Sequence, residues 1–349
     1  MEYERIAREK LDRLRERDDY LILAFESSCD ETAVAVIRGR EILANEIDSQ
    51  IEIHKRFGGV VPEIASRNHI LAIDSLVEIA LEKAGCTLSD IDVIAVTYGA
   101  GLLGALLVGV SYAKSLAYAL NKPLVAVDHI KGHVCANFLA HPDLKFPFLC
   151  LLASGGHTEV LDVRSYSDMR ILGQTADDAA GEAFDKVARV IGLPYPGGPQ
   201  IERAAKEGKD CIPLPRPFKG EKTYNFSYSG IKTAVINYAH TCAQKGIEIN
   251  KADVAASFQS RAVGMLIENA VRAAREKGEG TIVIAGGVAA NTALREGMEK
   301  AAKKHGINVL LPPKYLCTDN AAMIGEAAFF AIKEGIPAAR MDLDANPNL

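Results

Sequence analysis

The feature that most constrains this chain is a pattern that occurs twice. In each copy, two apolar strands joined by a short polar turn come first, and a further strand, a glycine turn and a helix-like stretch come later. The four hairpin strands are residues 21–25, 32–37, 148–153 and 158–163. The later strands are residues 94–97, followed by Tyr98-Gly99-Ala100-Gly101, and residues 281–285, followed by Gly286-Gly287-Val288. The repeat predicts an internally duplicated α/β fold, with mixed sheets and helices on their faces.

Composition supports a globular protein with one or two cores. The chain has 349 residues, of which 48% are hydrophobic and 24% charged, a balance typical of core-forming proteins. Tryptophan is absent and aromatic residues make up only 6%, so the core must be built mostly from Ala, Val, Ile and Leu. The net charge of −5 neither indicates nor excludes a nucleic-acid partner, because phosphate binding depends on local basic surface.

Several classes of protein are disfavoured. The seven cysteines are scattered and form no C-x-x-C pair, which argues against a disulfide framework or a thiolate zinc site and fits a reducing compartment. The charged N-terminus lacks the apolar stretch of a signal peptide. The longest apolar run, residues 102–110, is too short to cross a bilayer. We therefore expect a soluble, cytoplasmic protein with no membrane partner.

Residues 1–19 form a charged segment with apolar positions at Ile6, Leu11 and Leu14. This pattern predicts a solvated helix or a frayed arm, and the alternative is a helix that binds a partner.

Two histidines are candidate metal ligands. His129 and His133 follow a predicted strand at residues 123–127, and their i, i+4 spacing at the start of a helix can place both on one face. The alternative is one capping and one buried histidine with no common role. A third ligand should be a carboxylate or histidine elsewhere, and Asp319 is suitable by residue type.

Two glycine turns are candidate anion-binding sites. Ser154-Gly155-Gly156-His157 can form a concavity of backbone N–H groups, or can be a plain hairpin turn. Gly286-Gly287, with Asn291 behind it, follows a strand at the position where α/β folds bind nucleotides. Neither turn is a Walker A loop, since no G-x-x-x-x-G-K-[ST] is present.

Two further segments have more than one interpretation. Residues 177–186 carry acidic side chains on a predicted helix. These acids either form a charged surface with an Asp at the N-cap of the helix, or they bind the ribose hydroxyls of a nucleotide. Residues 216–222 interleave basic residues before Tyr224, Phe226 and Tyr228. That pattern suits single-stranded nucleic acid, but also a solvated loop that enters a strand.

Taken together, the motifs resemble the tRNA threonylcarbamoyladenosine transferase family of the bacterial TsaD type, once described as O-sialoglycoprotein endopeptidases. The resemblance runs from about residue 21 to the C-terminus. The matching motifs, in order, are E-S-S-C-D-E-T at 26–32, F-G-G-V-V-P-E-I-A-S-R at 57–67, H-I-K-G-H at 129–133, S-G-G-H-T at 154–158, residues 177–186, Y-P-G-G-P at 195–199, F-S-Y-S-G-I-K-T at 226–233, A-G-G-V at 285–288 with Asn291, and C-T-D-N at 317–320. Asp128 departs from the pattern, since many members have a histidine there.

The resemblance implies a duplicated actin/Hsp70/sugar-kinase-like fold, two lobes with a nucleotide cleft between them. It assigns residues 20–140 to the first lobe and 141–320 to the second, with a C-terminal helix at about 321–345 packed back on the first. It implies transfer of a threonylcarbamoyl group from threonylcarbamoyl-AMP to the N6 amine of adenosine 37, in tRNAs that read codons beginning with A. It also implies two partners, a paralogous inactive subunit of the TsaB type and a small ATPase of the TsaE type.

The resemblance also assigns site residues. The metal, Fe²⁺ or Zn²⁺, would be held by His129, His133 and Asp319, and Mg²⁺ is expected where ATP is bound. Asp30 and Glu31 would position or deprotonate the amine. The residues expected to bind the adenylate are Leu152, Ala153, Ser154, Gly155, Gly156, Asp185, Gly198, Glu202 and Asn291.

Two other functions are alternatives to group transfer. A metalloprotease of the H-E-x-x-H type is disfavoured, because Ile130 follows His129 and the general base is missing. A non-enzymatic ATP-binding scaffold or chaperone-like subunit is the alternative. The histidine pair argues against it, since such folds hold Mg²⁺ with carboxylates and phosphates.

Overall fold

The computed structural model describes residues 2–349 and divides them into two compact units. Unit 1 contains the chain up to Asp143 together with Asp319–Leu349, and unit 2 is Leu144–Thr318. The lobe boundaries expected from sequence lie at residues 140/141 and 320/321. The segment after Asp319 belongs to unit 1 and contains the last helix.

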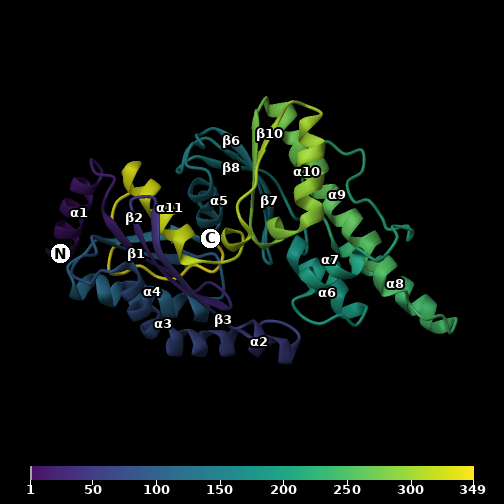
Figure 1. The fold of residues 1–349 in the computed structure, drawn as a ribbon, viewed down its shortest axis with the longest axis horizontal. Helices are drawn as coiled ribbons and strands as arrows, with labels where there is room; N and C mark the ends of the chain where they lie inside the picture. The colour runs from purple at the N-terminus through teal and green to yellow at the C-terminus, as the bar shows by residue number, and fades with distance from the viewer. Residues whose placement is uncertain (1) are drawn as a thin grey trace. The chain divides into compact units, whose positions relative to one another are not determined.

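Unit 1 is built on a five-stranded mixed sheet (Figure 1). Its strands are β1 (Leu21–Glu26), β2 (Glu31–Arg38), β3 (Glu41–Ser49), β4 (Val93–Gly99) and β5 (Leu124–Asp128), in the order β3-β2-β1-β4-β5. β1, β2 and β3 pair antiparallel, whereas β4 and β5 run parallel to β1. The carboxyl ends of β1, β4 and β5 therefore lie at one edge of the sheet.

Unit 2 repeats this topology. Its strands are β6 (Phe148–Ala153), β7 (Thr158–Val163), β8 (Met169–Gln174), β9 (Thr281–Ala285) and β10 (Asn308–Leu310). The order is β10-β9-β6-β7-β8, with β6, β7 and β8 antiparallel and β9 and β10 parallel to β6. Read from the β8 edge, the order and directions are those of unit 1, so the duplication predicted from sequence is confirmed.

Helices cover both faces of the sheet in unit 1. The helices are α1 (Glu2–Leu14), α2 (Ile51–His54), α3 (Pro62–Ala84), α4 (Leu103–Ala119), α5 (His129–Ala140) and α11 (Ala321–Lys333). Leu23 and Phe25 of β1 share a core with residues of α3 and α4, while Ala24 lies beside Gly325 of α11. Alternate strand residues point to opposite faces, so β1 is buried from both sides.

Unit 2 is packed around one long helix. Its helices are α6 (Ala180–Val190), α7 (Gly197–Ala205), α8 (Ser229–Gln244), α9 (Lys251–Lys277) and α10 (Thr292–Lys303). α9 packs on β6 and β9 and also contacts α7, α8 and α10. Phe258 of α9 meets Phe184 of α6 edge-on, with 5.0 Å between ring centroids. The rest of this core is mostly aliphatic, as the composition predicted.

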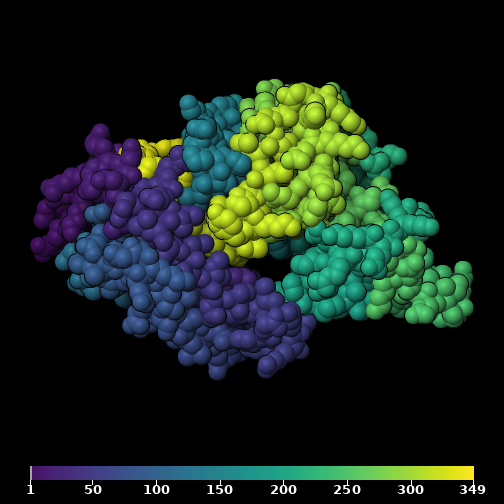
Figure 2. Space-filling view, in the orientation of Figure 1, coloured from purple at the N-terminus to yellow at the C-terminus, as the bar shows by residue number. Residues whose placement is uncertain are grey.

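The charged N-terminal segment forms a docked helix rather than a frayed arm. In Figure 2, α1 (purple) lies against the rest of unit 1. It buries Tyr3, Ala7, Leu11 and Leu14 at helical spacing, and the Tyr3 hydroxyl donates to the Lys122 carbonyl at 2.8 Å. The apolar stripe explains the docking, since it gives the helix a face to bury.

None of the described helices combines the length and apolar character that a membrane span requires.

Candidate metal centre and nucleotide-binding turns

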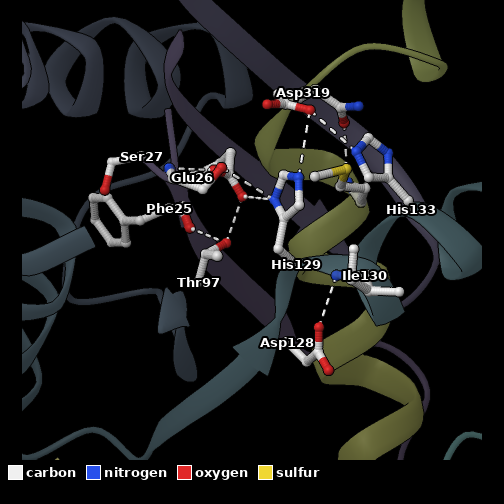
Figure 3. Close-up of polar contacts among 12 residues, drawn as sticks. Phe25, Glu26, Ser27, Thr97, Asp128, His129, Ile130, His133 and Asp319 are labelled. Atoms are coloured by element: carbon white, nitrogen blue, oxygen red, sulfur yellow. Dashed lines mark hydrogen bonds and ion pairs between the residues drawn. The ribbon is translucent and has the colours of Figure 1, made fainter. Parts of the chain in front are cut away.

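Two histidines and one aspartate converge at the carboxyl-end edge of the unit 1 sheet (Figure 3). His129 opens α5 directly after β5, and His133 follows one turn later. Asp319 immediately precedes Asn320, whose side chain caps α11 by accepting from the Met323 amide at 3.0 Å. Asp319 Oδ1 lies 3.1 Å from His133 Nε2 and 3.6 Å from His129 Nε2. The structure thus brings the three expected ligands together.

A fourth residue, Glu26, orients the His129 ring from the side opposite to Asp319. Glu26 ends β1 and is 1% exposed. Its Oε2 lies 3.0 Å from His129 Nδ1 and accepts from the Thr97 hydroxyl at 2.6 Å, while its Oε1 accepts from the Ser28 amide at 2.5 Å. With Nδ1–H donating to this carboxylate, Nε2 faces Asp319 and is the ring nitrogen that could bind a metal. Such a carboxylate–histidine pair is usual behind a metal ligand.

Sequence reasoning missed Glu26. In the sequence it is one of three acids in a polar turn, and nothing distinguishes it from Asp30 or Glu31. The available signal was its place as the last residue of an apolar strand, which continues the alternation into the interior.

The electrostatics of the cluster favour a cation. Burial lowers the pKa of His129, but the charges of Glu26 and Asp319 outweigh it and raise the pKa to about 9. Burial and the charges of Asp319 and Asp30 raise the pKa of Glu31 to about 9. Both groups therefore hold a proton near neutral pH because acids are crowded around them, and a bound cation could take the place of these protons.

The donor set also fits a transition metal. His133 is 1% exposed, and among the described residues its Nδ1 has no hydrogen-bond partner, while its Nε2 has only the ion-pair contact with Asp319, an arrangement that is costly unless another ligand satisfies it. Two imidazoles and one carboxylate with open positions suit Zn²⁺ or Fe²⁺. The side-chain atoms that would bind the ion all lie within 4.8 Å of one another.

The other two expected site residues of unit 1, Asp30 and Glu31, lie in the turn between β1 and β2. Asp30 is 7% exposed. The Gln50 amide donates to the Asp30 carbonyl at 3.0 Å, and the Ser49 hydroxyl donates to Glu31 Oε1 at 3.1 Å. The charge of Asp319 acts on Glu31, so the turn faces the histidine–aspartate cluster.

In unit 2 the turns after β6 and β9 lie side by side. The two strands are parallel, with Leu152 opposite Ala285, so both chains leave the sheet at the same edge. A Cβ on Gly286 would come within 2.4 Å of the Ala153 carbonyl. Ser154 closes the first turn through its amide, which donates to the His157 carbonyl at 2.8 Å, while Gly155 and Gly156 are exposed. This is the edge where α/β folds bind nucleotides.

The remaining expected residues of unit 2 connect to this edge. Gly181 of α6 packs on Ser154 and Gly155, and Asp185, one turn later, accepts from the Gly197 amide at the start of α7 at 2.6 Å. α7 carries Gly198, with open space at its Cα, and Glu202, which accepts from the Thr292 amide at 3.2 Å. Asn291 caps α10.

Sequence reasoning missed Gln259, which holds Asn291. The side-chain Nδ2 of Asn291 donates to Gln259 Oε1 at 2.9 Å. Gln259 lies on α9, 32 residues before Asn291. A single polar residue on a long helix gives no sequence signal for a contact with a residue so far along the chain.

One interpretation of each of two segments needs correction. Residues 177–186 do contain a helix, but α6 starts at Ala180 with Ala179 at its N-cap. Asp177 instead accepts from the amides of Tyr228 and Ser229, where α8 begins. Phe226 and Tyr228 are fully buried, so neither can stack on a nucleic-acid base. They could not be distinguished from exposed aromatics because the surrounding loop is polar.

Asp128, which departs from the family pattern, has a structural role. It is the N-cap of α5, and its carboxylate accepts from the Ile130 amide at 2.7 Å. A cap of this kind fixes the start of the helix, and with it the position of His129 and His133.

Comparison with known proteins yields close relatives. A family model described as TsaD, tRNA N6-adenosine threonylcarbamoyltransferase, matches residues 41–326. A tRNA N6-adenosine threonylcarbamoyltransferase of Clostridium perfringens (strain ATCC 13124) is 58% identical over 334 residues, 95% of this chain and 98% of that protein. One of Clostridium botulinum (strain 657) is 56% identical over 330 residues, 94% of this chain and 97% of that protein.

Among solved structures, more distant proteins share the fold. Full-length HypF in a phosphate- and nucleotide-bound form matches with a TM-score of 0.62 at 16% identity, over 93% of this chain and 48% of HypF. The activator of 2-hydroxyisocaproyl-CoA dehydratase from Clostridium difficile matches with a TM-score of 0.51 at 14% identity, over 90% of this chain and 96% of the activator. With the two equivalent sheets, these matches confirm the duplicated actin/Hsp70/sugar-kinase-like fold.

Proposed function

The chain belongs to the tRNA N6-adenosine threonylcarbamoyltransferase family, and we propose that it takes the threonylcarbamoyl group from threonylcarbamoyl-AMP. The acceptor is the N6 amine of adenosine 37 in tRNAs that read codons beginning with A, and AMP is released. The observation that carries this proposal is the histidine–aspartate cluster beside the Asp30–Glu31 turn in unit 1. It combines ligands for a Lewis acid with carboxylates that can accept a proton.

The proposal includes one divalent metal ion, Fe²⁺ or Zn²⁺, held by His129, His133 and Asp319. A metal ion bound there would polarise an oxygen of the acyl or phosphate group and help to place the substrate. Glu26 holds the His129 ring so that Nε2 faces Asp319 and would be available to the ion. Support comes from the buried His133 ring and from the acids near Glu31, which together with burial raise the pKa of its carboxyl.

The adenylate is proposed to bind in unit 2, at the turns after β6 and β9. The exposed Gly155 and Gly156 leave backbone N–H groups accessible to the phosphate, and Asn291, Glu202, Asp185 and Gly198 surround the same edge. The nucleotide-bound HypF structure and the dehydratase activator with bound ADPNP share this fold. If ATP binds at this place instead of the adenylate, Mg²⁺ would bind together with it.

The chemical step needs a proton acceptor. The N6 nitrogen attacks the carbamoyl carbon, the new N–C bond forms, and the bond from that carbon to the phosphate oxygen breaks. The phosphate oxygen keeps the electron pair and leaves as AMP, while the N6 proton passes to Asp30, or to Glu31 if a bound cation lowers the raised pKa of its carboxyl. A carboxylate within hydrogen-bond reach of the amine can perform this transfer, and the Gln50 amide and the Ser49 hydroxyl bond the Asp30 carbonyl and the Glu31 carboxylate in the turn.

We also propose that the chain works in the cytoplasm with two partners, a paralogous TsaB-type subunit and a TsaE-type ATPase. An exposed apolar face on α3 and α4 is consistent with a protein partner. α3 and α4 run parallel, with Ser66 next to Gly104 and Tyr112 bonded to Asp74. Ile70, Leu71 and Leu107 lie between these two contacts and are 63%, 77% and 38% exposed, and Leu103, directly before Gly104, is 49% exposed.

Mass spectrometry of digested tRNA tests the function. Unmodified tRNA is incubated with this protein, threonylcarbamoyl-AMP and the partner subunits, and threonylcarbamoyladenosine is measured. His133→Ala is compared with His240→Ala, a change at an exposed histidine of α8, and bound metal is measured in each protein. We expect product and metal with wild type and His240→Ala, and neither with His133→Ala.

The other outcomes separate the parts of the proposal. Product from both variants would leave the transfer chemistry intact but remove the metal role of His133. No product from wild-type protein that still binds adenine nucleotide would favour the scaffold function. Modification at a position other than adenosine 37 would correct the acceptor.

A further inference from the structure

His69 contacts both ends of the turn that carries Asp30 and Glu31. It lies on α3, is fully buried, and has no place among the site residues assigned above. Its Nε2 lies 3.0 Å from the Cys29 carbonyl, and its Nδ1 lies 2.7 Å from the Thr32 hydroxyl. The two carboxylates are the only residues between these contacts.

The two contacts fix the state of the ring. A carbonyl oxygen can only accept, so Nε2 must carry the proton that it donates to Cys29. In a neutral imidazole, Nδ1 is then an acceptor, and the Thr32 hydroxyl donates to it. Burial lowers the pKa of His69, although the Cys29 carbonyl and the nearby acids oppose this, so the ring is neutral at pH 7.

Other bonds fix the rest of the turn but do not replace the histidine. The Ser28 carbonyl accepts from the Leu102 amide at 2.7 Å, and the Asp30 carbonyl accepts from the Gln50 amide at 3.0 Å. These bonds hold single points of the backbone. Among the described side chains, His69 is the one whose hydrogen bonds join the residue before Asp30 to the residue after Glu31, so together with the β1–β2 pairing it fixes the distance between the two ends.

We propose that His69 is a positioning residue that holds the Asp30 and Glu31 carboxylates in the geometry needed for proton transfer. This inference rests on the proposed transferase function and on the role of those carboxylates in it. Displacing a reacting group by about 1 Å can slow a reaction by about 10²-fold. His69 therefore acts on the rate of the chemical step and not on adenylate binding, which is assigned to unit 2.

Steady-state kinetics with tRNA and the partner subunits tests this. Wild type is compared with His69→Ala, with Thr32→Val, which removes only the hydroxyl at nearly constant shape, and with Thr32→Ser, which keeps it. Ile73→Ala is the matched control, because Ile73 is buried one turn further along α3 and touches the apolar core. We expect kcat to fall about 10²-fold in His69→Ala and less in Thr32→Val. The KM for threonylcarbamoyl-AMP should be nearly unchanged, and Thr32→Ser should recover most of kcat.

Two further measurements distinguish positioning from loss of stability. His69→Ala is added to the combined Asp30→Asn and Glu31→Gln protein, where a positioning residue has nothing left to position and should cause no further loss. Hydrogen exchange of the Gln50 amide, which donates to Asp30, should be faster in His69→Ala than in Ile73→Ala.

Each result has a definite meaning. A kcat for His69→Ala equal to that of Ile73→Ala, or a full additional loss in the combined background, would overturn the positioning role while the transferase function stands. If His69→Ala does not fold, Thr32→Val decides, and an unchanged kcat there has the same meaning. Near-normal transfer by the Asp30→Asn and Glu31→Gln protein would instead remove the carboxylates from the proposed mechanism, and the positioning role with them.

Discussion

The two equivalent hairpin turns differ in what they bury. The turn between β1 and β2 hides its side chains, with Glu26, Ser27, Ser28 and Asp30 each under 10% exposed, and places them against α3 and α5. The turn between β6 and β7 has two exposed glycines and offers its backbone. The same topology therefore presents carboxylates in one unit and N–H groups in the other.

The contrast extends to the units as a whole. Unit 1 buries the titratable side chains of Glu26, Asp30, Glu326 and four histidines, whereas in unit 2, all of which the structure describes, Asp162 is the one buried acid or histidine. Burying charge is costly unless it is paired or bonded, and unit 1 meets this cost with pairs such as Glu26–His129. Proton and metal chemistry is thus expected from unit 1, and anion binding by backbone from unit 2.

The largest expected effect tests whether unit 2 binds an anion through its backbone. Gly286 has φ 86° and ψ 165°, a region that is essentially restricted to glycine, and a Cβ there would lie 2.4 Å from the Ala153 carbonyl. We expect Gly286→Ala to cost about 3 to 4 kcal/mol, from backbone strain plus the overlap. Calorimetry should show adenine-nucleotide affinity reduced by about 100-fold or more.

The control is Gly264→Ala on α9, outside the proposed binding turns, because a Cβ on Gly264 meets nothing within 4 Å. Metal binding, assigned to unit 1, should be normal in both variants. Loss of metal from Gly286→Ala would show that the two sites are not independent.

The second effect tests the buried charges of unit 1. Glu326 has no exposed side-chain surface and pairs with Arg40 at 2.7 Å. Burial raises its pKa to about 7 against an ordinary 4.5, although Arg40 opposes this. Its protonated form is therefore favoured by folding, so its contribution to stability is full below about pH 4.5 and is lost as the pH rises through about 7.

Urea unfolding of wild type and Glu326→Gln across this window measures the effect. Wild type should lose about 2 to 3 kcal/mol relative to the variant between about pH 4.5 and pH 7. Glu299→Gln, at an exposed position of unit 2, should follow wild type throughout. Parallel curves for wild type and Glu326→Gln would mean that Arg40 keeps Glu326 ionised at all pH values.

A third effect separates metal affinity from nucleotide affinity. Glu26→Gln removes the charge behind His129 but keeps an oxygen for its Nδ1–H. Changes to such supporting residues typically weaken metal binding by about 10- to 100-fold. Titration with Co²⁺, followed by its absorption spectrum, should show this loss, and Thr97→Val, which removes one bond to Glu26, should show less. Unchanged Co²⁺ affinity in Glu26→Gln would assign Glu26 to packing alone.

Sequence predicted the mostly buried strands better than the partly exposed ones. The hairpin strands and β4, β5 and β9 were placed to within two residues, because they are apolar runs between polar turns. β3, β8 and β10 were not predicted. They are edge strands in which most residues are partly exposed, so their sequences carry little apolar pattern.

The candidate site was predictable where its members are close in sequence. The spacing of His129 and His133 pointed to a shared face, and the family motifs supplied Asp319. Glu26 and His69 act through partners 103 and 40 residues away. Only the pairing of β1 with β4 and the packing of α3 on β2 bring them to those partners, and no local pattern encodes these contacts.

The smallest expected effect tests whether the turn between β6 and β7 binds a ligand or only connects the two strands. A Cβ on Gly155 would meet nothing within 4 Å, so Gly155→Ala should change the free energy of unfolding by no more than about 0.5 kcal/mol. A methyl group beside the exposed N–H should still hinder a phosphate, and AMP affinity should fall about threefold to tenfold. Gly264→Ala on α9, where the space is equally open, is the control and should bind AMP as wild type does. If Gly155→Ala also binds AMP normally, glycine at this position serves the hairpin alone, and the contrast between the two turns is one of burial without a difference in ligand.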